Sequence, residues 1–247
     1  MESKTKIKAI VLAAGKGSRM GMSVPKVLVT LQGKPVLRLV LDTLMEAGVA
    51  HTVIVVSPAT HEPIREAVGD SFTYALQTEQ LGSGHAVLSA RNAAQDADKL
   101  VIMCGDSPLF KTETIKSLVD EIQGDAVIVL TSAVLDDPTG YGRIQRTRMG
   151  EVIGVAEEKN AADEQKAIRE INGGAYAFDA GWLWRNIDLM SKNEAGEYCL
   201  TEMVDIAISQ GRKVTTVPCG ADEVAGINTP DQLMEAEDVL QKRRGLH

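Results

Sequence analysis

Short apolar runs alternate with segments of helical periodicity through the first half of the chain. The runs at 7–12, 53–56 and 100–103 predict buried strands. Between the first two, residues 36–45 carry an amphipathic helical pattern, and Gly48 follows as the predicted end of that helix. Continuous apolar strands that alternate with helices are typical of a parallel sheet covered on both faces. We therefore predict a Rossmann-like α/β fold, with a mixed but mostly parallel sheet and helices on both faces.

The second half of the chain has shorter strands joined by turns. Strands are predicted at 126–134, 140–144, 151–157, 171–178 and 214–217. Further helices are predicted at 85–94, 113–122 and 200–208. A last helix is expected to begin with Thr229 as N-cap, Pro230 in its first position and Gln232 three residues after the cap. We expect one domain over all 247 residues, with a nucleotide-binding half at about 1–110 and a substrate-binding half at about 111–247.

Charge and cysteine content exclude several classes of protein. The chain has 26 Lys and Arg against 34 Asp and Glu, whereas a nucleic-acid-binding surface needs a surplus of basic residues. The longest segment without Asp, Glu, Lys or Arg, residues 47–61, is too short to span a membrane, and the N-terminus carries no secretory signal. Cys104, Cys199 and Cys219 form no CxxC pair, so no disulfide or thiolate metal site is expected. We expect a cytoplasmic protein without nucleic-acid or membrane partners.

A loop of small residues follows the first predicted strand. It reads LAAGKGSRM over residues 12–20, and PKVL follows at 25–28. Small residues let backbone N–H groups approach a ligand closely, and Lys16, Arg19 and Lys26 add positive charge, which predicts a cradle for phosphates. The simpler alternative is an ordinary tight turn between a strand and a helix. The loop matches neither the GxGxxG dinucleotide fingerprint nor the GxxxxGK[ST] phosphate-binding loop.

A second glycine-containing segment spans residues 77–86. The Gln77 amide offers both a donor and an acceptor, which is enough to contact a base edge. Gly82 and Gly84 permit close backbone approach to a ligand. The alternative is a surface turn in which Ser83 caps the next helix, and we expect His85 to belong to that helix start rather than to act as a base.

Polar residues follow several of the predicted strands. Asp106 comes directly after Cys104-Gly105, at the carboxyl end of a buried strand, where ligands bind in open α/β sheets. A carboxylate there can hold Mg²⁺, although an aspartate that only caps the next helix is the alternative. Four other polar or small residues end strand-like segments, and each alone is a common turn or cap residue: Gly142, Glu157, Asn172 and Asn228.

Nine motifs occur in an order and at spacings that resemble a known family. The family is the uridylyltransferase domain of bacterial N-acetylglucosamine-1-phosphate uridylyltransferase/glucosamine-1-phosphate acetyltransferases. The motifs are LAAGKGSRM, PKVL, QLGSGHA, CGDSPL, GYGRI, EEKNA, EINGG, EYCLTEMVDIA and AGIN. The resemblance runs from about residue 6 to about residue 240. The first motif marks only the wider sugar-phosphate nucleotidylyltransferase superfamily, whereas GYGRI, EINGG, EYCLTE and AGIN are more specific to the uridylyltransferase branch.

The resemblance implies a Mg²⁺-dependent transfer of UMP from UTP to N-acetylglucosamine 1-phosphate, with release of pyrophosphate. Arg19 and Lys26 would act on the phosphates as catalytic cations, and Asp106 with Asn228 would hold Mg²⁺. The resemblance also implies a set of nucleotide contacts, from Leu12, Ala13, Ala14, Gly15, Gln77, Gly82 and Ser83. It implies that three residues bind the sugar, namely Gly142, Glu157 and Asn172.

The sequence departs from the family at a few places. Ser83 stands where the family usually has Thr, and Cys104 stands where it often has Tyr. Glu158 and Asn160 change the usual charge pattern of the EEKNA segment. The chain carries no hexapeptide repeats of the left-handed β-helix that forms the family's acetyltransferase domain, so we do not expect acetyl transfer.

Three alternative functions remain open from the sequence. The first is a related nucleotidylyltransferase that uses another sugar 1-phosphate, or CTP or dTTP. The second is a nicotinamide-dependent dehydrogenase. Two features disfavour it: Met20 stands where the fingerprint needs a third glycine, and no acidic residue directly follows the strand at 53–56. The third is a non-catalytic protein that only senses nucleotide sugars, which the presence of phosphate- and metal-binding residue types disfavours.

Overall fold

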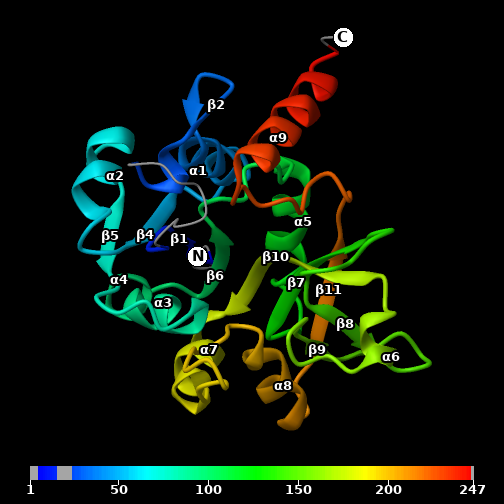
Figure 1. Cartoon of the computed structure of the whole chain (residues 1–247). Helices are drawn as coiled ribbons and strands as arrows, with labels where there is room; N and C mark the ends of the chain where they lie inside the picture. Colours follow the sequence, from blue (N-terminus) through cyan, green and yellow to red (C-terminus); the bar gives the residue numbers. More distant parts are fainter. Residues whose placement is uncertain (1–4, 16–23, 246–247) are drawn as a thin grey trace.

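Nine strands of the described chain form one mixed sheet (Figure 1). The computed structural model describes residues 5–15 and 24–245. The strand order is β11-β7-β10-β6-β1-β4-β5, and β8 adds to β10 while β9 adds to β8. The strands are β1 (Ile7–Leu12), β4 (His51–Val56), β5 (Thr73–Leu76), β6 (Lys99–Cys104), β7 (Ile128–Val134), β8 (Arg143–Arg146), β9 (Val152–Ala156), β10 (Glu170–Asp179) and β11 (Val214–Pro218).

Helices cover both faces of this sheet (Figure 1). The helices are α1 (Val36–Glu46), α2 (His61–Val68), α3 (Ser83–Ser89), α4 (Arg91–Ala94), α5 (Thr112–Glu121), α6 (Asp163–Lys166), α7 (Ala180–Asn186), α8 (Glu202–Ser209) and α9 (Pro230–Arg243). Ile10 of β1 packs in a cluster with α3, α4, α7 and α8, whereas its neighbour Val11 packs in a second cluster with α1, α2 and α5. Both side chains are fully buried, as expected for a strand covered on two sides.

The predicted α/β fold is confirmed, including the mixed, mostly parallel sheet. The strand predicted at 7–12 is β1, and the helix predicted at 36–45 is α1, which is followed by Gly48 with a φ of +86°. The helix predicted at 85–94 is interrupted, because α3 and α4 are separated at Ala90. The sequence did not predict α2, β5 or α7, which are at most eight residues long and therefore give weak periodic signals. Among the described residues, no helix is both long and apolar enough to cross a membrane.

Strand β10 runs opposite to its neighbours and thereby sets where the second half of the site lies. β1 pairs in parallel with β4 and β6, whereas β10 pairs antiparallel with β6 and β7. Because Tyr176 faces Ile102 and Asp179 faces Lys99, the first residues of β10 lie at the carboxyl end of β6. The EINGG motif, which begins β10, is therefore at the same sheet edge as the residues that follow β6.

Two glycines make a bulge in β10. The register with β7 shifts between Asn172 and Tyr176. A Cβ on Gly173 would lie 2.5 Å from Thr131 Oγ1, and Gly174 has a φ of +89°, so both positions require glycine. Residues four apart on a regular strand are separated by about 13 Å. The bulge instead brings Asn172 and Tyr176 together, and Asn172 Nδ2 donates to Tyr176 Oη at 2.5 Å.

Helix α9 begins as the sequence predicts and supports a loop of the site. Thr229 is the N-cap, and its Oγ1 accepts from the backbone N–H of Gln232 at 3.3 Å. Gln232 Oε1 in turn accepts from the backbone N–H of Asn228 at 2.8 Å. An apolar cluster that includes Leu31, Ile227 and Ala236 fixes the helix against the loop that carries Asn228.

We predict that Thr229→Ala lowers the free energy of unfolding by about 1 kcal/mol, because the first turn of α9 loses its side-chain acceptor. Thr229→Ser keeps the hydroxyl and should remain close to the parent protein. Urea unfolding of both variants checks this. Equal losses in the two variants would show that packing of the threonine methyl group, and not the cap, stabilises this helix start.

Candidate active site

The carboxyl ends of β1 and β6 place the small-residue loop beside Asp106. Leu12 and Cys104 are paired at the ends of the two strands, and the Gly105 N–H donates to the Leu12 carbonyl at 2.9 Å. The Ala13 N–H donates to the Val55 carbonyl at 2.8 Å, which continues the contact with β4. Ala13 and Ala14 are buried, and Gly15 is the last described residue before the gap. Arg19, which the sequence assigned to the phosphates, lies outside the described residues.

Lys26, Asp106 and Asn228 meet at this edge although they come from three distant segments. Lys26 Nζ forms an ion pair with Asp106 Oδ2 and donates to Asn228 Oδ1 at 2.8 Å. The Lys26 and Asp106 side chains are only 16% and 15% exposed, so their attraction is less screened than that of a surface pair. A Cβ on Gly15 would lie 3.9 Å from Lys26 Cε, which places the start of the phosphate loop next to the same lysine.

The Asp106 carboxylate and the Asn228 amide oxygen form a position suited to a cation. The ammonium group of Lys26 contacts both oxygens, which shows that the two can share one positive charge. The described residues contain no cluster of three or more His, Cys, Asp or Glu side chains that could hold a metal. Mg²⁺ usually takes only one or two protein oxygens and completes its shell with water and substrate phosphate. The donor set at this position therefore fits Mg²⁺.

Backbone contacts hold Asn228 in place. The Ile227 N–H donates to the Asp106 carbonyl at 2.8 Å, which ties the AGIN segment to the CGDSPL segment.

The nearby Cys104 thiol is not a reactive group, because burial raises its pKa to about 12 and the Asp106 charge adds to this effect.

The segment that follows β5 places Gln77 in the interior. Gln77 is 3% exposed, and its amide Nε2 donates to the Gly82 carbonyl at 3.2 Å. Gly82 has a φ of +96°, and a Cβ there would lie 2.5 Å from the Tyr198 carbonyl oxygen. The backbone therefore packs against the second half of the chain at a distance that only glycine allows.

Ser83 connects the two halves and does not cap α3. Its Oγ accepts from the Leu200 N–H at 3.0 Å, and Gly82 occupies the N-cap position. The alternative in which Ser83 caps the helix is thus wrong. The reason is that the Leu200 backbone N–H reaches the hydroxyl from outside the helix.

Gly142 directly precedes β8, Glu157 directly follows β9, and Asn172 lies near the start of β10, so the three residues are close together. The Gly142 carbonyl accepts from the Asn172 N–H at 2.8 Å, and a Cβ on Gly142 would lie 3.0 Å from Val155 Cγ1. Burial raises the pKa of the Tyr176 hydroxyl, which accepts from Asn172 Nδ2 and also lies close enough to feel the charge of Glu157. The sequence analysis did not single out Tyr176, because its position in an apolar run predicts only a core residue.

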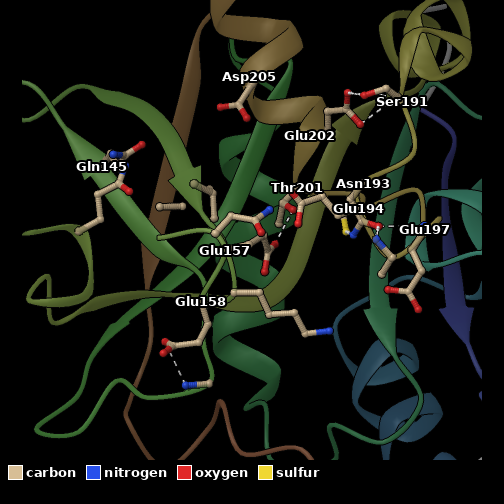
Figure 2. Close-up of a pocket in the computed structure, with 18 residues that line it drawn as sticks. Gln145, Glu157, Glu158, Ser191, Asn193, Glu194, Glu197, Thr201, Glu202 and Asp205 are labelled. Atoms are coloured by element: carbon tan, nitrogen blue, oxygen red, sulfur yellow. Dashed lines mark hydrogen bonds between the residues drawn. The ribbon is translucent and has the colours of Figure 1, made fainter. Parts of the chain in front are cut away.

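A cavity of about 890 Å³ opens beside Glu157 (Figure 2). Glu157 Oε1 accepts from the buried Thr201 Oγ1 at 2.5 Å, so a residue of the EYCLTE motif holds this carboxylate. The lining is rich in acidic groups, including Glu158, Glu197, Glu202 and Asp205. Burial, with the nearby charge of Glu202, raises the pKa of Asp205.

The cavity lining contains Glu157 but not Lys26, Asp106 or Gln77. The chemistry would therefore occur where Lys26, Asp106 and Asn228 meet at the sheet edge, and not within the cavity.

Arg143 was also missed by the sequence analysis. Its side chain is 2% exposed, pairs with Glu158 Oε2 at 2.7 Å and donates to the Tyr141 carbonyl. Glu158 also accepts from the Gly140 N–H at 3.2 Å, and the Arg143 guanidinium lowers the pKa of this carboxyl. The arginine of GYGRI thus fixes the loop around Gly142 to the residue that follows Glu157. The signal that could have revealed it was a charged residue directly before the apolar Ile144, within the strand predicted at 140–144.

These features define an α/β protein with a mixed, mostly parallel sheet and a position suited to a cation at the carboxyl edge of that sheet. Residues 9–171 match the family model described as the MobA-like NTP transferase domain. The chain belongs to this family of nucleotidyltransferases. The alternative of a nicotinamide-dependent dehydrogenase is therefore wrong.

Relatives with similar sequences carry the name bifunctional protein GlmU. The protein of Heliobacterium modesticaldum is 43% identical over 239 residues, 95% of this chain, and that of Brevibacillus brevis is 41% identical over 244 residues, 97% of this chain. The chain spans about half the length, 52%, of each of these relatives. A Bacillus anthracis crystal structure assigned as a glucose-1-phosphate thymidylyltransferase has a TM-score of 0.79 over 94% of each chain at 20% identity, which supports the fold.

We predict that Gly82→Ala destabilises the protein and weakens nucleotide binding. Gly82 has a φ of +96° and a ψ of 176°, a backbone region that costs a residue with a Cβ about 1–3 kcal/mol, and the clash with the Tyr198 carbonyl adds to that cost. Gly150→Ala is the matched control, because Gly150 has a φ of +88° but open space around its Cβ position. Urea unfolding should show a larger loss for the Gly82 variant, and equal losses would contradict the close approach.

Proposed function

We propose that the chain transfers UMP from UTP to N-acetylglucosamine 1-phosphate, giving UDP-N-acetylglucosamine and pyrophosphate, in a Mg²⁺-dependent reaction. The observation that carries the proposal is the meeting of Lys26, Asp106 and Asn228 beside the small-residue loop. The motif resemblance and the similarity to the GlmU proteins support the choice of substrates. A cytoplasmic location, expected from the cysteine content, is part of this proposal.

The two substrates would approach from opposite sides of the Lys26 position. We assign the nucleotide to the first half, with the phosphates on the segment from Leu12 to Gly15 and the base near Gln77 and Gly82. We assign the sugar to the second half, as the sequence analysis proposed. The antiparallel direction of β10 supports this division, because it brings sugar-binding candidates to the same edge as Asp106.

The chemistry needs positioning and charge neutralisation rather than a general base. The attacking group is a phosphate oxygen of the sugar phosphate, which is already ionised at neutral pH. Lys26 would contact the phosphates as a point charge, and Arg19 would add a forked contact to them. When bound to Asp106 and Asn228, Mg²⁺ would supply positive charge shared between the phosphates. Most of the rate enhancement would come from orientation, because the site would hold the attacking phosphate oxygen in line with the bond that breaks.

The acidic cavity would orient the sugar phosphate. The sugar ring is neutral and can donate hydroxyl hydrogens to Glu157, which Thr201 holds in place. Its phosphate is repelled by the Glu202 and Asp205 side of the cavity and attracted by Lys26. We therefore expect the phosphate end of the molecule, and not the sugar ring, to face Lys26.

Pyrophosphate release with UTP and Mg²⁺, measured across a panel of sugar 1-phosphates, tests this function, with CTP and dTTP as controls. We expect strong preference for UTP with N-acetylglucosamine 1-phosphate. Turnover with another sugar or base would contradict the substrate assignment and favour a related nucleotidylyltransferase. Tight binding of nucleotide sugars without any release would contradict the enzyme assignment and favour a sensor.

We predict that Asp106→Asn keeps the fold but lowers turnover about 100-fold or more, because the cation position loses its only carboxylate. Asp136→Asn is the matched control, since Asp136 is fully exposed and pairs with Arg169 on the surface. Mn²⁺ binding measured by electron paramagnetic resonance should weaken in the Asp106 variant only. Near-normal turnover and Mn²⁺ binding in that variant would defeat the metal assignment.

A further inference from the structure

We infer that His85 is a positioning residue that fixes the Gln77 amide in the orientation that selects uracil over cytosine. The inference rests on the proposed function, in which Gln77 contacts the base. It assigns to His85 a role in specificity, although the sequence predicted only a place at the helix start. Two hydrogen bonds of the Gln77 amide fix its orientation.

The first hydrogen bond settles which way the Gln77 amide faces. Gln77 Nε2 lies 3.2 Å from the Gly82 carbonyl oxygen, and a carbonyl oxygen can only accept. The atom near Gly82 must therefore be the NH₂ group of the amide. The opposite orientation would place two acceptor oxygens against each other in the protein interior, where Gln77 is 3% exposed.

The second hydrogen bond comes from the same NH₂ group. Gln77 Nε2 lies 3.1 Å from His85 Nδ1, so this ring nitrogen accepts and the imidazole is neutral with its proton on Nε2. Both amide hydrogens of Gln77 are then directed at protein acceptors. Oε1 is left as the polar atom that the side chain can offer to a ligand.

The His85 ring is held from the second half of the chain. It stacks on Tyr198, with ring centroids 6.4 Å apart and planes 25° apart. Tyr198 is itself fixed by two backbone hydrogen bonds of 2.8 Å, one from Gly84 N–H to its carbonyl and one from its N–H to the Leu81 carbonyl. The acceptor at Nδ1 is therefore preorganised, and little freedom remains for the Gln77 amide to rotate.

A fixed acceptor at Oε1 distinguishes the pyrimidine bases at one atom. Uracil and thymine carry a hydrogen on N3, whereas N3 of cytosine has a lone pair and accepts. Oε1 at N3 thus favours uracil and opposes cytosine, while a rotated amide would present its NH₂ group and reverse the preference. His85 and the Gly82 carbonyl together hold the amide against that rotation.

The test is the ratio of kcat/KM for UTP to that for CTP in His85→Phe. Phenylalanine keeps a ring for Tyr198 but has no acceptor for Gln77. We expect the ratio to fall about fivefold to tenfold, as the loss of one neutral hydrogen bond produces. The ratio for UTP to dTTP should stay unchanged, because both bases carry a hydrogen on N3.

His85→Asn is the rescue variant, because its side-chain oxygen can lie close to the position of Nδ1 and accept the same hydrogen bond from Gln77. It should retain most of the selectivity that His85→Phe loses. In a Gln77→Ala background, His85→Phe should cause no further loss of selectivity, since the residue through which it acts is gone. Thermal unfolding identifies folded variants, and His85→Leu replaces the Phe variant if that one does not fold.

Calorimetric binding of UTP and CTP gives the same ratio without turnover. It separates a failure of this inference from a failure of the proposed reaction, which would leave the parent protein without pyrophosphate release. Equal losses for UTP, CTP and dTTP in a folded His85→Phe protein would overturn the inference. So would a selectivity in His85→Asn as low as in His85→Phe.

Discussion

The contact of Lys26 with Asp106 and Asn228 is the interaction on which the rest of the site depends. It joins the segment after the first loop, the end of β6 and the loop before α9. Lys26 and Asp106 are half-buried, and either charge without its partner would lower the stability of the fold. The ion pair therefore lets Lys26 and Asp106 offset each other's charge at the sheet edge. The same oxygens suit a divalent cation, and the same ammonium group suits a phosphate.

The direction of β10 is the second constraint. A parallel strand at this place would carry Asn172 to the opposite edge of the sheet. The antiparallel strand instead begins where β6 ends, and the bulge at Gly173 and Gly174 brings Asn172 to Tyr176. Arg143 and Thr201 then fix the neighbouring carboxylates of Glu158 and Glu157. The residues proposed to bind the sugar and those proposed to bind the phosphates thus share one edge of the sheet.

Much of the fold follows from local patterns, whereas the contacts within the site depend on long-range packing. The apolar run of β1 and the cap at Thr229 are local signals, and both predictions are confirmed. Asp106 and Asn228 were grouped only through a family resemblance, because 122 positions separate them in the sequence. Arg143 and Thr201 have their partners in the segment after β9, and Tyr176 meets Asn172 only because of the bulge in β10, so local patterns could not reveal these contacts. The alternative in which Ser83 caps a helix is wrong, because its hydroxyl accepts from a backbone N–H of the second half of the chain.

A crystal structure with UTP and Mn²⁺ tests the central claim most directly. Anomalous scattering locates Mn²⁺ without ambiguity, and the position of Lys26 Nζ is visible in the same map. The account predicts Mn²⁺ within bonding distance of Asp106 and Asn228, with Lys26 displaced from between them onto a phosphate. Mn²⁺ bound elsewhere, or Lys26 still between the two oxygens while UTP is bound, would contradict it.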